Sequence, residues 1–374
     1  MMSDDFAISG VCDPRFAAVR EAFHANFTER NEIGAAVAVI VGGKVVVDLI
    51  GGWRDAGRTQ PWQPGTLVNV WSSTKGVAAA CFAMLVDAGR LSYDDPVARY
   101  WPEFAAEGKA TITIGQLLSH QAGLCGFTAP ARFADLLGGS AAAARLAAQA
   151  PLWRPGTASG YHAISVGILA TELFERITGT SLRQFVADEL RGRRGLEISI
   201  GLDAKDEARR AEMIAPPDMD SAQVGSLTAP QIAALANPPL DPLAPNTPEW
   251  RAADLPSANG HANARGLAAL YAALLDGRLV SRDSLVRATR TQIEGVDLVL
   301  GLPVRWGAGF LMNTDGIYGP NPAAFGHSGW GGSFAMGDPG AQVAMSYTMN
   351  RMGTQLRDDP RAKALIDALY AAID

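Results

Sequence analysis

Apolar residues recur at helical spacing over much of the chain. Residues 13–30 carry four large apolar side chains at this spacing behind an Asp-Pro start, which predicts an amphipathic N-terminal helix. The alanine- and leucine-rich stretch after Ser72 ends at Asp87-Ala88-Gly89, and it predicts a mostly buried helix with a glycine stop. The same spacing predicts further helices over residues 113–120, 129–150, 164–177, 182–190, 262–275 and 360–373.

Runs of apolar and β-branched residues lie near both ends of the chain. Residues 35–41 and 45–50 are joined by Gly42-Gly43-Lys44, which is typical of a β-hairpin. Further strands are predicted near the C-terminus, over residues 307–312, 324–328, 333–336 and 343–349. Strands therefore occupy the two ends of the chain, and helices fill the middle.

This order predicts an α+β fold with two lobes. We expect residues 1–70 and 262–374 to form one antiparallel sheet flanked by the terminal helices, and residues 71–261 to form a mainly helical lobe. Ser72 would then lie at the seam between the lobes, where pockets usually form. A segment of the helical lobe, residues 215–256, holds too many prolines for regular structure, and it is either a linker or a loop that lines the pocket.

Composition narrows the classes of function. The chain has 374 residues, of which 48% are hydrophobic and 19% are charged, so it buries a substantial core. A formal net charge of −6 without basic clusters argues against nucleic acid or an anionic membrane as a partner, and no apolar stretch is long enough to span a bilayer. We expect a small, largely neutral substrate.

The three cysteines, Cys12, Cys81 and Cys125, are far apart and lie among apolar residues. Their spacing indicates neither a disulfide framework nor a metal site, and the sequence indicates no cofactor. The N-terminus is acidic and lacks the basic and apolar regions of a signal peptide, so we expect a cytoplasmic protein.

Ser72 and Lys75 stand one turn apart at the start of the buried helix, so a lysine amine can reach a serine hydroxyl. A serine becomes a good nucleophile only when a neighbouring base takes its proton. Lysine is such a base only when it is uncharged, and burial in an apolar core lowers the pKa of a lysine from about 10.4. The helix N-terminus would also stabilise developing negative charge.

A plainer interpretation of the same two residues is available. Ser72 could be an ordinary helix N-cap and Lys75 a solvated first-turn residue, because S-x-x-K often arises by chance. Lysine is scarce in this chain, however, since it occurs only five times while arginine supplies most of the positive charge. A lysine inside an apolar helix therefore favours the catalytic interpretation.

Lys75 cannot complete the reaction alone, because the leaving group also needs a proton. Tyr161 follows a Pro-Gly turn and could shuttle this proton, although a tyrosine is more often a packed aromatic residue, and His162 beside it competes for the role. Residues 325–333, Phe-Gly-His-Ser-Gly-Trp-Gly-Gly-Ser, predict a glycine-rich strand edge that a substrate can approach closely. Backbone N–H groups of this edge could complete an oxyanion hole.

In order and spacing, these pieces resemble the serine β-lactamase and penicillin-binding-protein superfamily, and in detail the class C β-lactamase-like esterases, or family VIII carboxylesterases. Residues 72–75, Ser-Ser-Thr-Lys, are similar to the S-x-x-K box, and Tyr-His-Ala at 161–163 falls where the Y-x-N box belongs. His-Ser-Gly at 327–329 falls where K-T-G belongs, and Trp-Gly-Gly at 330–332 is similar to the W-G-G of the esterase branch. Residues 117–124 resemble a further family segment, and the resemblance covers nearly the whole chain.

The hypothesis that follows is a two-step acyl transfer. Ser72 would be the nucleophile, Lys75 and Tyr161 a coupled general base and acid, and the N–H groups of Ser72 and Trp330 the oxyanion hole. We expect substrate contacts from the third box, from the histidine after the tyrosine and from a nearby tryptophan: Trp153, His162, His327, Ser328, Gly329 and Trp330.

Two departures from the family pattern count against antibiotic hydrolysis. Ala163 stands where the lactamases carry Asn or Ser, and His327 stands where they carry a lysine that would hold a β-lactam carboxylate. We therefore expect a carboxylesterase that cleaves small esters. The alternatives are a β-lactamase or D-amino-acid peptidase, and a catalytically silent ligand-binding member of the fold. A Ser-His-Asp triad with His120, His261 or His327 has no supporting spacing.

Overall fold

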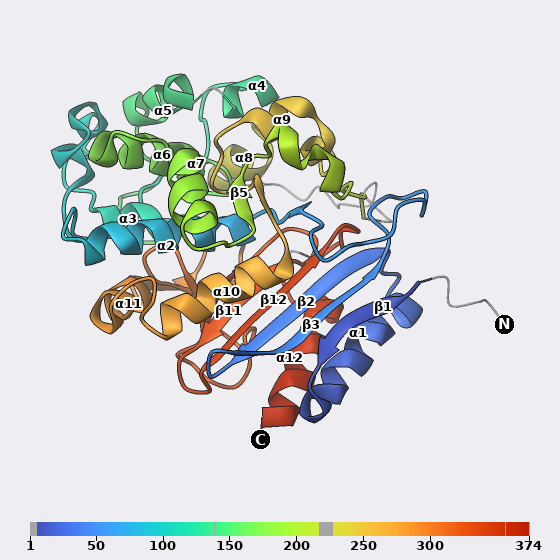
Figure 1. Cartoon of the computed structure of the whole chain (residues 1–374). Helices are drawn as coiled ribbons and strands as arrows, with labels where there is room; N and C mark the ends of the chain where they lie inside the picture. Colours follow the sequence, from blue (N-terminus) through green and yellow to red (C-terminus); the bar gives the residue numbers. More distant parts are fainter. Residues whose placement is uncertain (1–5, 138, 217–226, 356, 374) are drawn as a thin grey trace.

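The computed structural model describes residues 6–137, 139–216, 227–355 and 357–373. Figure 1 shows a large antiparallel sheet with helices on both faces and, beside it, a group of helices formed by the middle of the chain. This arrangement confirms the predicted α+β fold class. The group formed by residues from the middle of the chain is called the helical group below.

The large sheet is built from strands of both ends of the chain. Its described strands are β1 (Ile8–Cys12), β2 (Gly34–Val41), β3 (Lys44–Gly52), β7 (Ile293–Val296), β8 (Pro303–Trp306), β9 (Leu311–Met312), β10 (Phe325–Ser328), β11 (Phe334–Asp338) and β12 (Val343–Met349). They follow the order β1-β3-β2-β12-β11-β10-β9-β8-β7, and every neighbouring pair is antiparallel. The predicted hairpin, β2 and β3, therefore pairs directly with the last strand of the chain.

Helices cover both faces of this sheet (Figure 1). The predicted terminal helices, α1 (Ala17–Glu29) and α12 (Pro360–Ile373), pack together on one face, and α10 (Ala264–Leu275) covers the other. Because both faces are covered, all residues of β12 and nearly all of β2 are buried, in agreement with their continuous apolar sequence.

The remaining described elements lie mostly in the helical group. Its helices are α3 (Ile114–Leu118), α4 (Phe133–Leu136), α5 (Gly139–Ala148), α6 (Ser165–Thr178), α7 (Leu182–Phe185), α8 (Ala229–Leu235) and α9 (Pro248–Ala252), while α11 (Arg282–Thr289) packs against α2 (Ser73–Asp87). A small second sheet has the order β4-β6-β5, with strands β4 (Val68–Asn69), β6 (Gly260–Ala262) and β5 (Ile198–Ile200). This sheet joins a strand that precedes Ser72 to two strands from the middle of the chain.

α2 lies between the large sheet and the helical group. It contacts β10 and β11 on one side and α6 and α7 on the other. All of its residues except Met84 and Asp87 are buried. A helix made largely of alanine, valine and other apolar residues can be covered on all sides, and this is why a lysine on α2 lies in the interior.

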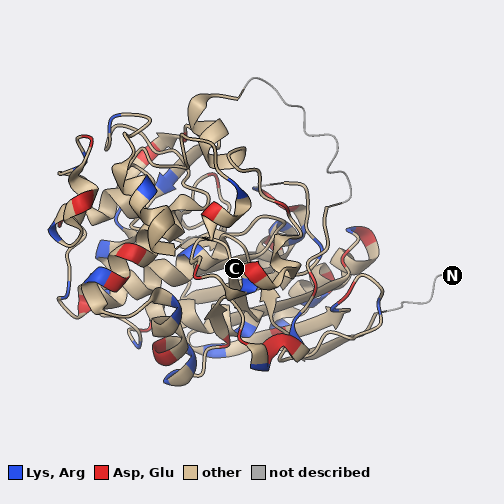
Figure 2. Ribbon diagram, turned by 90° about the horizontal axis from the view of Figure 1, so that it is seen from above, with Lys and Arg blue, Asp and Glu red and all other residues tan. Residues whose placement is uncertain are grey.

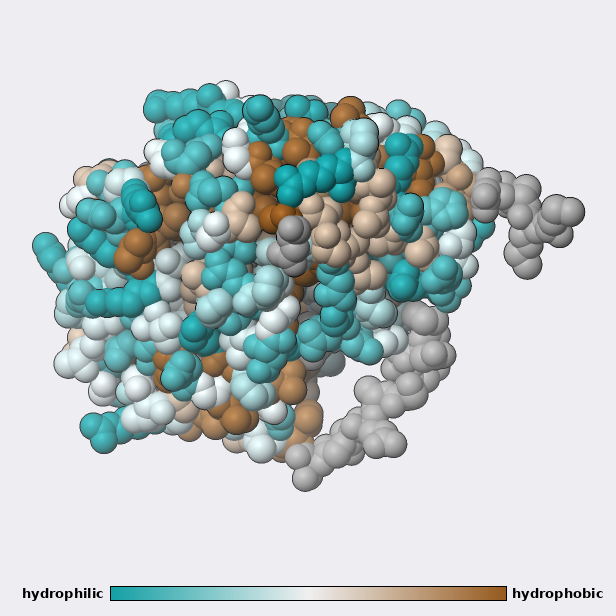
Figure 3. Space-filling model, turned by 90° about the horizontal axis from the view of Figure 1, so that it is seen from below, coloured by the Kyte–Doolittle hydropathy of each residue, from teal (hydrophilic) through white to brown (hydrophobic). Residues whose placement is uncertain are grey.

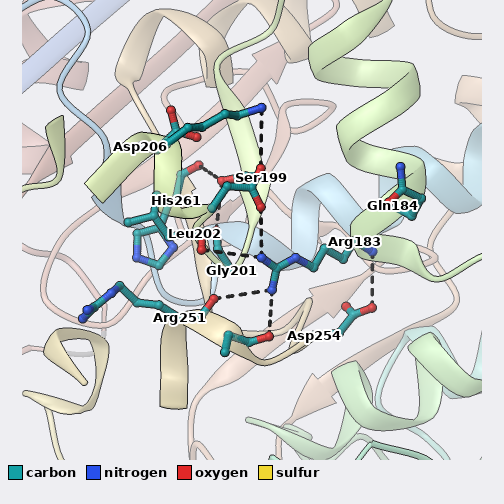
Figure 4. Close-up of polar contacts among 12 residues, drawn as sticks. Arg183, Gln184, Ser199, Gly201, Leu202, Asp206, Arg251, Asp254 and His261 are labelled. Atoms are coloured by element: carbon teal, nitrogen blue, oxygen red, sulfur yellow. Dashed lines mark hydrogen bonds and ion pairs between the residues drawn. The ribbon is translucent and has the colours of Figure 1, made fainter. Parts of the chain in front are cut away.

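Arg183 on α7 fixes the chain segment that leads from α9 to β6. Its guanidinium donates hydrogen bonds to the carbonyl oxygen of Ala252 (2.7 Å) and to Asp203 (3.1 Å), and its backbone N–H donates to Asp254 (3.4 Å). Figure 4 shows Arg183 reaching between Leu202, Arg251 and Asp254. The segment held in this way continues directly to a residue of the candidate site.

Some boundaries predicted from the sequence were wrong. Residues 307–312 are not one strand, because the Gly307 N–H donates to the Phe310 carbonyl oxygen (2.9 Å) in a tight turn between β8 and β9. The edge strands β1 and β7 were missed because most of their residues are exposed and show no apolar alternation. The predicted helix over 129–150 is broken between α4 and α5, and the one over 182–190 continues as a π-helical segment, Val186–Gly192.

The proline-rich segment contains more regular structure than predicted. α8, α9 and a 3-10 turn at Ala244–Asn246 lie within residues 215–256, of which 217–226 lie outside the described part. Pro230, Pro245 and Pro248 each stand in the first turn of an element. Proline is tolerated there because the first N–H groups of a helix have no partner within the helix.

Acidic and basic residues are interspersed along the described chain rather than grouped by sign (Figure 2). Among the helices of the described ranges, none has both the length and the apolar character that crossing a membrane requires.

Candidate active site

Ser72 stands at the N-terminus of α2 in an unusual backbone setting. The residue before it, Trp71, has a φ of +46°, a left-handed conformation that is rare for a large side chain. Ring contacts with Trp250 (5.3 Å between centroids) and Trp330 (5.0 Å) hold Trp71 in place. The Ser72 side chain makes no capping hydrogen bond to the helix, so its interpretation as an ordinary N-cap is wrong and its hydroxyl is left for other partners.

Lys75 lies one turn further along α2 and is 4% exposed. Its Nζ lies 3.0 Å from Ser72 Oγ, 2.7 Å from the carbonyl oxygen of Ala163 and 2.8 Å from the carbonyl oxygen of Ser257. Burial lowers the pKa of Lys75 well below that of a free lysine. The lysine is therefore not solvated, and its surroundings favour the uncharged amine.

The uncharged form of Lys75 matches its three contacts. A neutral amine has two N–H groups and one lone pair, so the two carbonyl oxygens accept the N–H groups and the lone pair faces Ser72 Oγ. In the ammonium form Nζ donates to Ser72 Oγ, whereas in the neutral form the direction reverses and the Ser72 hydroxyl donates to Nζ. This is the direction of hydrogen bonding that a general base needs, because the proton already points at the base.

Tyr161 completes the cluster from the other side. Its Oη donates a hydrogen bond to Ser72 Oγ at 2.7 Å. Burial raises the pKa of Tyr161 above that of a free phenol, against the opposing effect of the hydrogen bond with Ser72, so Tyr161 is a neutral phenol at neutral pH. Its ring stacks on Trp306, with 5.9 Å between centroids and 7° between planes. Ser72 Oγ thus faces an acceptor in Lys75 and a donor in Tyr161.

A buried carboxylate holds the backbone of Tyr161, and sequence reasoning did not find it. Asp297 is fully buried and accepts hydrogen bonds from the backbone N–H of Tyr161 (2.8 Å) and from Ser159 Oγ (2.8 Å). It also accepts from the N–H groups of Val299 and Leu300, both at 3.0 Å. Asp297 is 136 residues from Tyr161 in sequence, so no local pattern indicates the contact.

The turn between β10 and β11 lies next to the start of α2. The Gly329 N–H donates to the Ser333 carbonyl oxygen (2.7 Å), and Ser333 Oγ donates to the carbonyl oxygen of Val70 (2.9 Å), two residues before Ser72. Neither the Ser72 N–H nor the Trp330 N–H donates a hydrogen bond to another described residue. Both are therefore free for a substrate oxygen, as the expected oxyanion hole requires.

His327 and Ser328 on β10 line the same cavity as Ser72. His327 is 2% exposed, and its Nδ1 lies 3.0 Å from the Ser328 carbonyl oxygen. Burial, with a smaller contribution from Lys75, lowers the pKa of His327 to about 3, so this imidazole carries no charge at neutral pH. Ser328 Oγ lies 3.1 Å from Tyr318 Oη.

The cavity beside Ser72 has a volume of about 560 Å³ and takes residues from both the sheet and the helical group. The proline-rich segment contributes residues 233–235 and 237–240, so it lines a pocket and is not a mere linker. Most of the wall is apolar, and it includes Phe127, Leu136, Ile168, Leu240, Val304 and Leu311. Two further lining residues, Leu235 and Leu302, are exposed. Figure 3 shows that hydrophobic residues gather in patches on the face seen from below.

The structure does not support the substrate contacts expected of His162 and Trp153, since neither lines the cavity. The ring of His162 is fully buried, with Nε2 accepting from the Leu124 N–H (3.1 Å) and Nδ1 lying 2.6 Å from the Gly160 carbonyl oxygen. Burial lowers its pKa to about 4. Trp153 Nε1 donates to the carbonyl oxygen of Ala158 (3.0 Å). Both side chains support the loop before Tyr161 rather than the cavity.

Two more supporting residues become visible only in three dimensions. Ser257, at the end of the segment fixed by Arg183, supplies one of the two carbonyl oxygens that hold Lys75. His120, which lies in a segment that resembles the family, has its ring 5.0 Å from that of Tyr161 and its Nδ1 3.2 Å from the His162 backbone nitrogen. Backbone oxygens leave no signature in a sequence, and this explains why Ser257 was not predicted.

A sequence model described as Beta-lactamase matches residues 19–369 of the chain. The chain belongs to the beta-lactamase family. Esterase/beta-lactamase LipL of Mycobacterium tuberculosis is 34% identical over 362 residues, which cover 92% of this chain and 83% of LipL. The predicted family and the predicted fold are thereby confirmed, and this member is a serine hydrolase of the β-lactamase fold.

Solved structures agree with this assignment. A crystal structure of a family VIII carboxylesterase has a TM-score of 0.93 and 44% identity to this chain, and covers 98% of this chain and 100% of its own. A penicillin-binding protein homologue from Caulobacter crescentus also has a TM-score of 0.93 and 44% identity, with the same coverage of 98% and 100%. The same fold over nearly the whole chain is therefore shared with a structure named as a carboxylesterase and with one named as a penicillin-binding protein homologue.

Proposed function

We propose that this protein is a carboxylesterase that cleaves small, uncharged carboxylic esters through an acyl-enzyme on Ser72. The observation that carries the proposal is the contact of Ser72 Oγ with two groups of opposite function, Lys75 Nζ at 3.0 Å and Tyr161 Oη at 2.7 Å. The names of the relatives, an esterase/beta-lactamase and a family VIII carboxylesterase, support the same reaction class.

Acylation uses both neighbours of the serine. Ser72 Oγ attacks the ester carbonyl carbon as its proton passes to Lys75 Nζ, and the carbonyl oxygen gains negative charge between the Ser72 and Trp330 N–H groups. The carbon–oxygen bond to the alcohol then breaks, and Tyr161 gives its proton to the departing alkoxide. Lys75, now an ammonium, then returns its proton directly to the Tyr161 phenolate, since Nζ lies 4.7 Å from the centre of the tyrosine ring and both groups face Ser72 Oγ.

Deacylation repeats these steps with water. A water molecule in the position of the departed alcohol attacks the acyl carbon while the Lys75 and Tyr161 pair accepts its proton. The bond to Ser72 Oγ breaks, the serine recovers its proton, and a carboxylic acid leaves. The pair titrates as one unit, so the pH dependence of turnover belongs to Lys75 and Tyr161 together.

The charges around the cavity favour uncharged substrates. The imidazole of His327 is neutral, and Ala163 has no polar side chain that could bind a charged substrate group. Of the cations that line the described cavity, Arg357 pairs with Asp315 (3.2 Å) and Lys363 pairs with Asp367. A β-lactam carboxylate would therefore bury its charge without a free cation, which is costly.

Turnover of p-nitrophenyl butyrate and of nitrocefin by the same preparation tests the proposal. We expect kcat/KM for the ester to exceed that for nitrocefin by about 100-fold or more, since a missing charge partner costs about 3 kcal/mol in a buried site. Ser72→Ala is the control for chemistry at the serine, and it should abolish both rates.

Faster hydrolysis of nitrocefin would favour a β-lactamase and contradict the proposal. Turnover of the ester that survives in Ser72→Ala would remove the serine from the mechanism. Absence of any turnover by the parent protein would favour a catalytically silent member of the fold.

A further inference from the structure

A buried ion cluster packs against residues 329–333, the turn that carries the Trp330 N–H, and one of its carboxylates, Asp359, also lines the cavity beside Ser72. It consists of Glu32, Asp359 and Arg361, which are 4%, 6% and 4% exposed. Arg361 Nη1 donates to Glu32 Oε2 at 3.1 Å, and Tyr347 Oη also donates to this carboxylate. Asp359 accepts from Arg361 Nε (3.0 Å) and Nη2 (2.8 Å) in a bidentate pair. Such pairs fix the orientation of a guanidinium group.

The guanidinium of Arg361 uses each of its N–H groups. Besides the carboxylates, Nη2 donates to the carbonyl oxygen of Gly331 (2.6 Å) and Nη1 to the carbonyl oxygen of Arg351 (2.8 Å). A guanidinium has five N–H donors in a planar fork, and these five contacts account for all of them. A lysine at this position has three donors and no fork, so it cannot reproduce the set.

The oxyanion turn, residues 329–333, packs directly against this cluster. A Cβ atom on Gly332 would lie 2.6 Å from Asp359 Oδ2 and 2.9 Å from Arg361 Nη2, so only glycine fits between them. The Gly331 carbonyl oxygen accepts from Arg361 and also from the Gly353 N–H (2.8 Å). Gly331 and Gly332 have φ angles of +92° and +119°, which leave their peptide planes easy to rotate unless a partner fixes them.

We propose that Arg361, held by Glu32 and Asp359, is a positioning residue that fixes the Gly331–Gly332 peptide, and with it the turn that aims the Trp330 N–H at the substrate oxygen. Ser333 anchors the other end of the turn to the chain just before Ser72 through its bond to Val70. The Arg361–Gly331 and Ser333–Val70 hydrogen bonds together fix the positions of the Trp330 and Ser72 N–H groups relative to each other. Arg361 does not line the cavity and acts only through Gly331.

This inference rests on the proposed ester hydrolysis. Negative charge on the carbonyl oxygen develops only as the serine attacks, so a misplaced N–H lowers kcat and leaves substrate binding nearly unchanged. If Arg361 had only a structural role, its replacement would lower the content of folded protein but leave the kcat of the folded enzyme unchanged.

Arg361→Lys is the direct test, with p-nitrophenyl butyrate as substrate and benzeneboronic acid as a tetrahedral mimic. We expect kcat to fall by about 10- to 100-fold, KM to stay within about twofold, and the inhibition constant of the boronic acid to rise in parallel with the loss in kcat. Tyr347→Phe is the matched control, because it removes a donor to Glu32 from the same cluster and leaves the bond to Gly331 intact. Its kcat should stay within about threefold of the parent.

Parental kcat in folded Arg361→Lys overturns the positioning role, as does an equal loss of kcat in Tyr347→Phe. If Arg361→Lys does not fold, Glu32→Gln replaces it, since it weakens the ion pair with Arg361 away from the cavity and should lower kcat with the same constant KM; an unchanged kcat there also overturns the role. A parent enzyme without turnover that depends on Ser72 refutes the proposed function as well, which separates the two failures.

Discussion

At the scale of single residues, the proposed mechanism requires that the surroundings of Lys75 favour its uncharged form. The amine is buried, and the carbonyl oxygens of Ala163 and Ser257 take two of its contacts. The spacing of Ser72 and Lys75 could be predicted from the sequence, because one helical turn brings them together wherever the helix lies. The two carbonyl oxygens could not, because any residue type supplies a carbonyl oxygen.

The depressed pKa of Lys75 has a consequence for stability with a definite sign. Between the pKa of folded Lys75 and about 10.4, the unfolded chain binds a proton that the folded chain does not. Folding stability in that window therefore rises with pH, by about 1.4 kcal/mol per pH unit for one group. We expect the free energy of unfolding of the parent, minus that of Lys75→Met, to increase by this slope within pH 7–10.

Urea unfolding of both proteins at pH 7, 8, 9 and 10 measures the difference. Lys363→Met is the matched control, because it removes the amine of an exposed lysine on α12 and not a buried one. A flat difference for Lys75→Met over the whole range would mean that Lys75 stays protonated in the folded protein, and it would remove the lysine from the role of general base.

At the scale of elements, the helix that carries Ser72 and the central hairpin could be predicted, and the edges could not. α2 is encoded by an alanine-rich run with a glycine stop, and β2 and β3 by two apolar runs around Gly42-Gly43. β1 and β7 are exposed edge strands whose pairing depends on the neighbour and not on their own pattern. The proline-rich segment was misjudged because the position of each proline in a first turn, not the number of prolines, decides whether a helix forms.

The loop after β7 shows how an element far from Ser72 enters the site. Asp297 in this loop accepts hydrogen bonds from the Ser159 hydroxyl, from the Tyr161 N–H and from two N–H groups of its own loop. Asp297→Ala would leave one buried and two partly buried backbone N–H groups without their acceptor, at up to about 1–3 kcal/mol each. We expect this variant to lose several kcal/mol of stability and about 10- to 100-fold in kcat, because Tyr161 would no longer be held within reach of Ser72 Oγ.

Asp297→Asn is the matched control for that variant. Its side-chain oxygen can accept the three backbone N–H groups, and its NH₂ group can donate to Ser159 Oγ, so kcat should stay within about threefold of the parent. Steady-state kinetics with p-nitrophenyl butyrate and thermal unfolding measure both effects. An Asp297→Ala protein with parental kcat would show that Tyr161 needs no support from this loop.

At the scale of the whole molecule, the active site depends on contacts between distant parts of the chain. Tyr161 lies 89 residues from Ser72, and Arg361 lies 329 residues from Glu32. The motifs around Ser72, Tyr161 and Trp330 follow the same order as in the family, and this order predicted that the three segments form one site. Asp297 and Arg361, the charged residues that support the site, belong to none of these motifs. Only folding of the chain brings Asp297 to Tyr161 and Arg361 to the oxyanion turn.

Reaction of the folded protein with a fluorophosphonate, followed by intact-mass measurement and peptide mapping, tests the central claim most directly. The account predicts one adduct per chain, on Ser72, and much slower labelling of Lys75→Ala at equal folded content, because the serine loses its base. An adduct on another residue, or labelling of Ser72 at the parental rate without Lys75, would contradict the claim that the buried amine activates this serine.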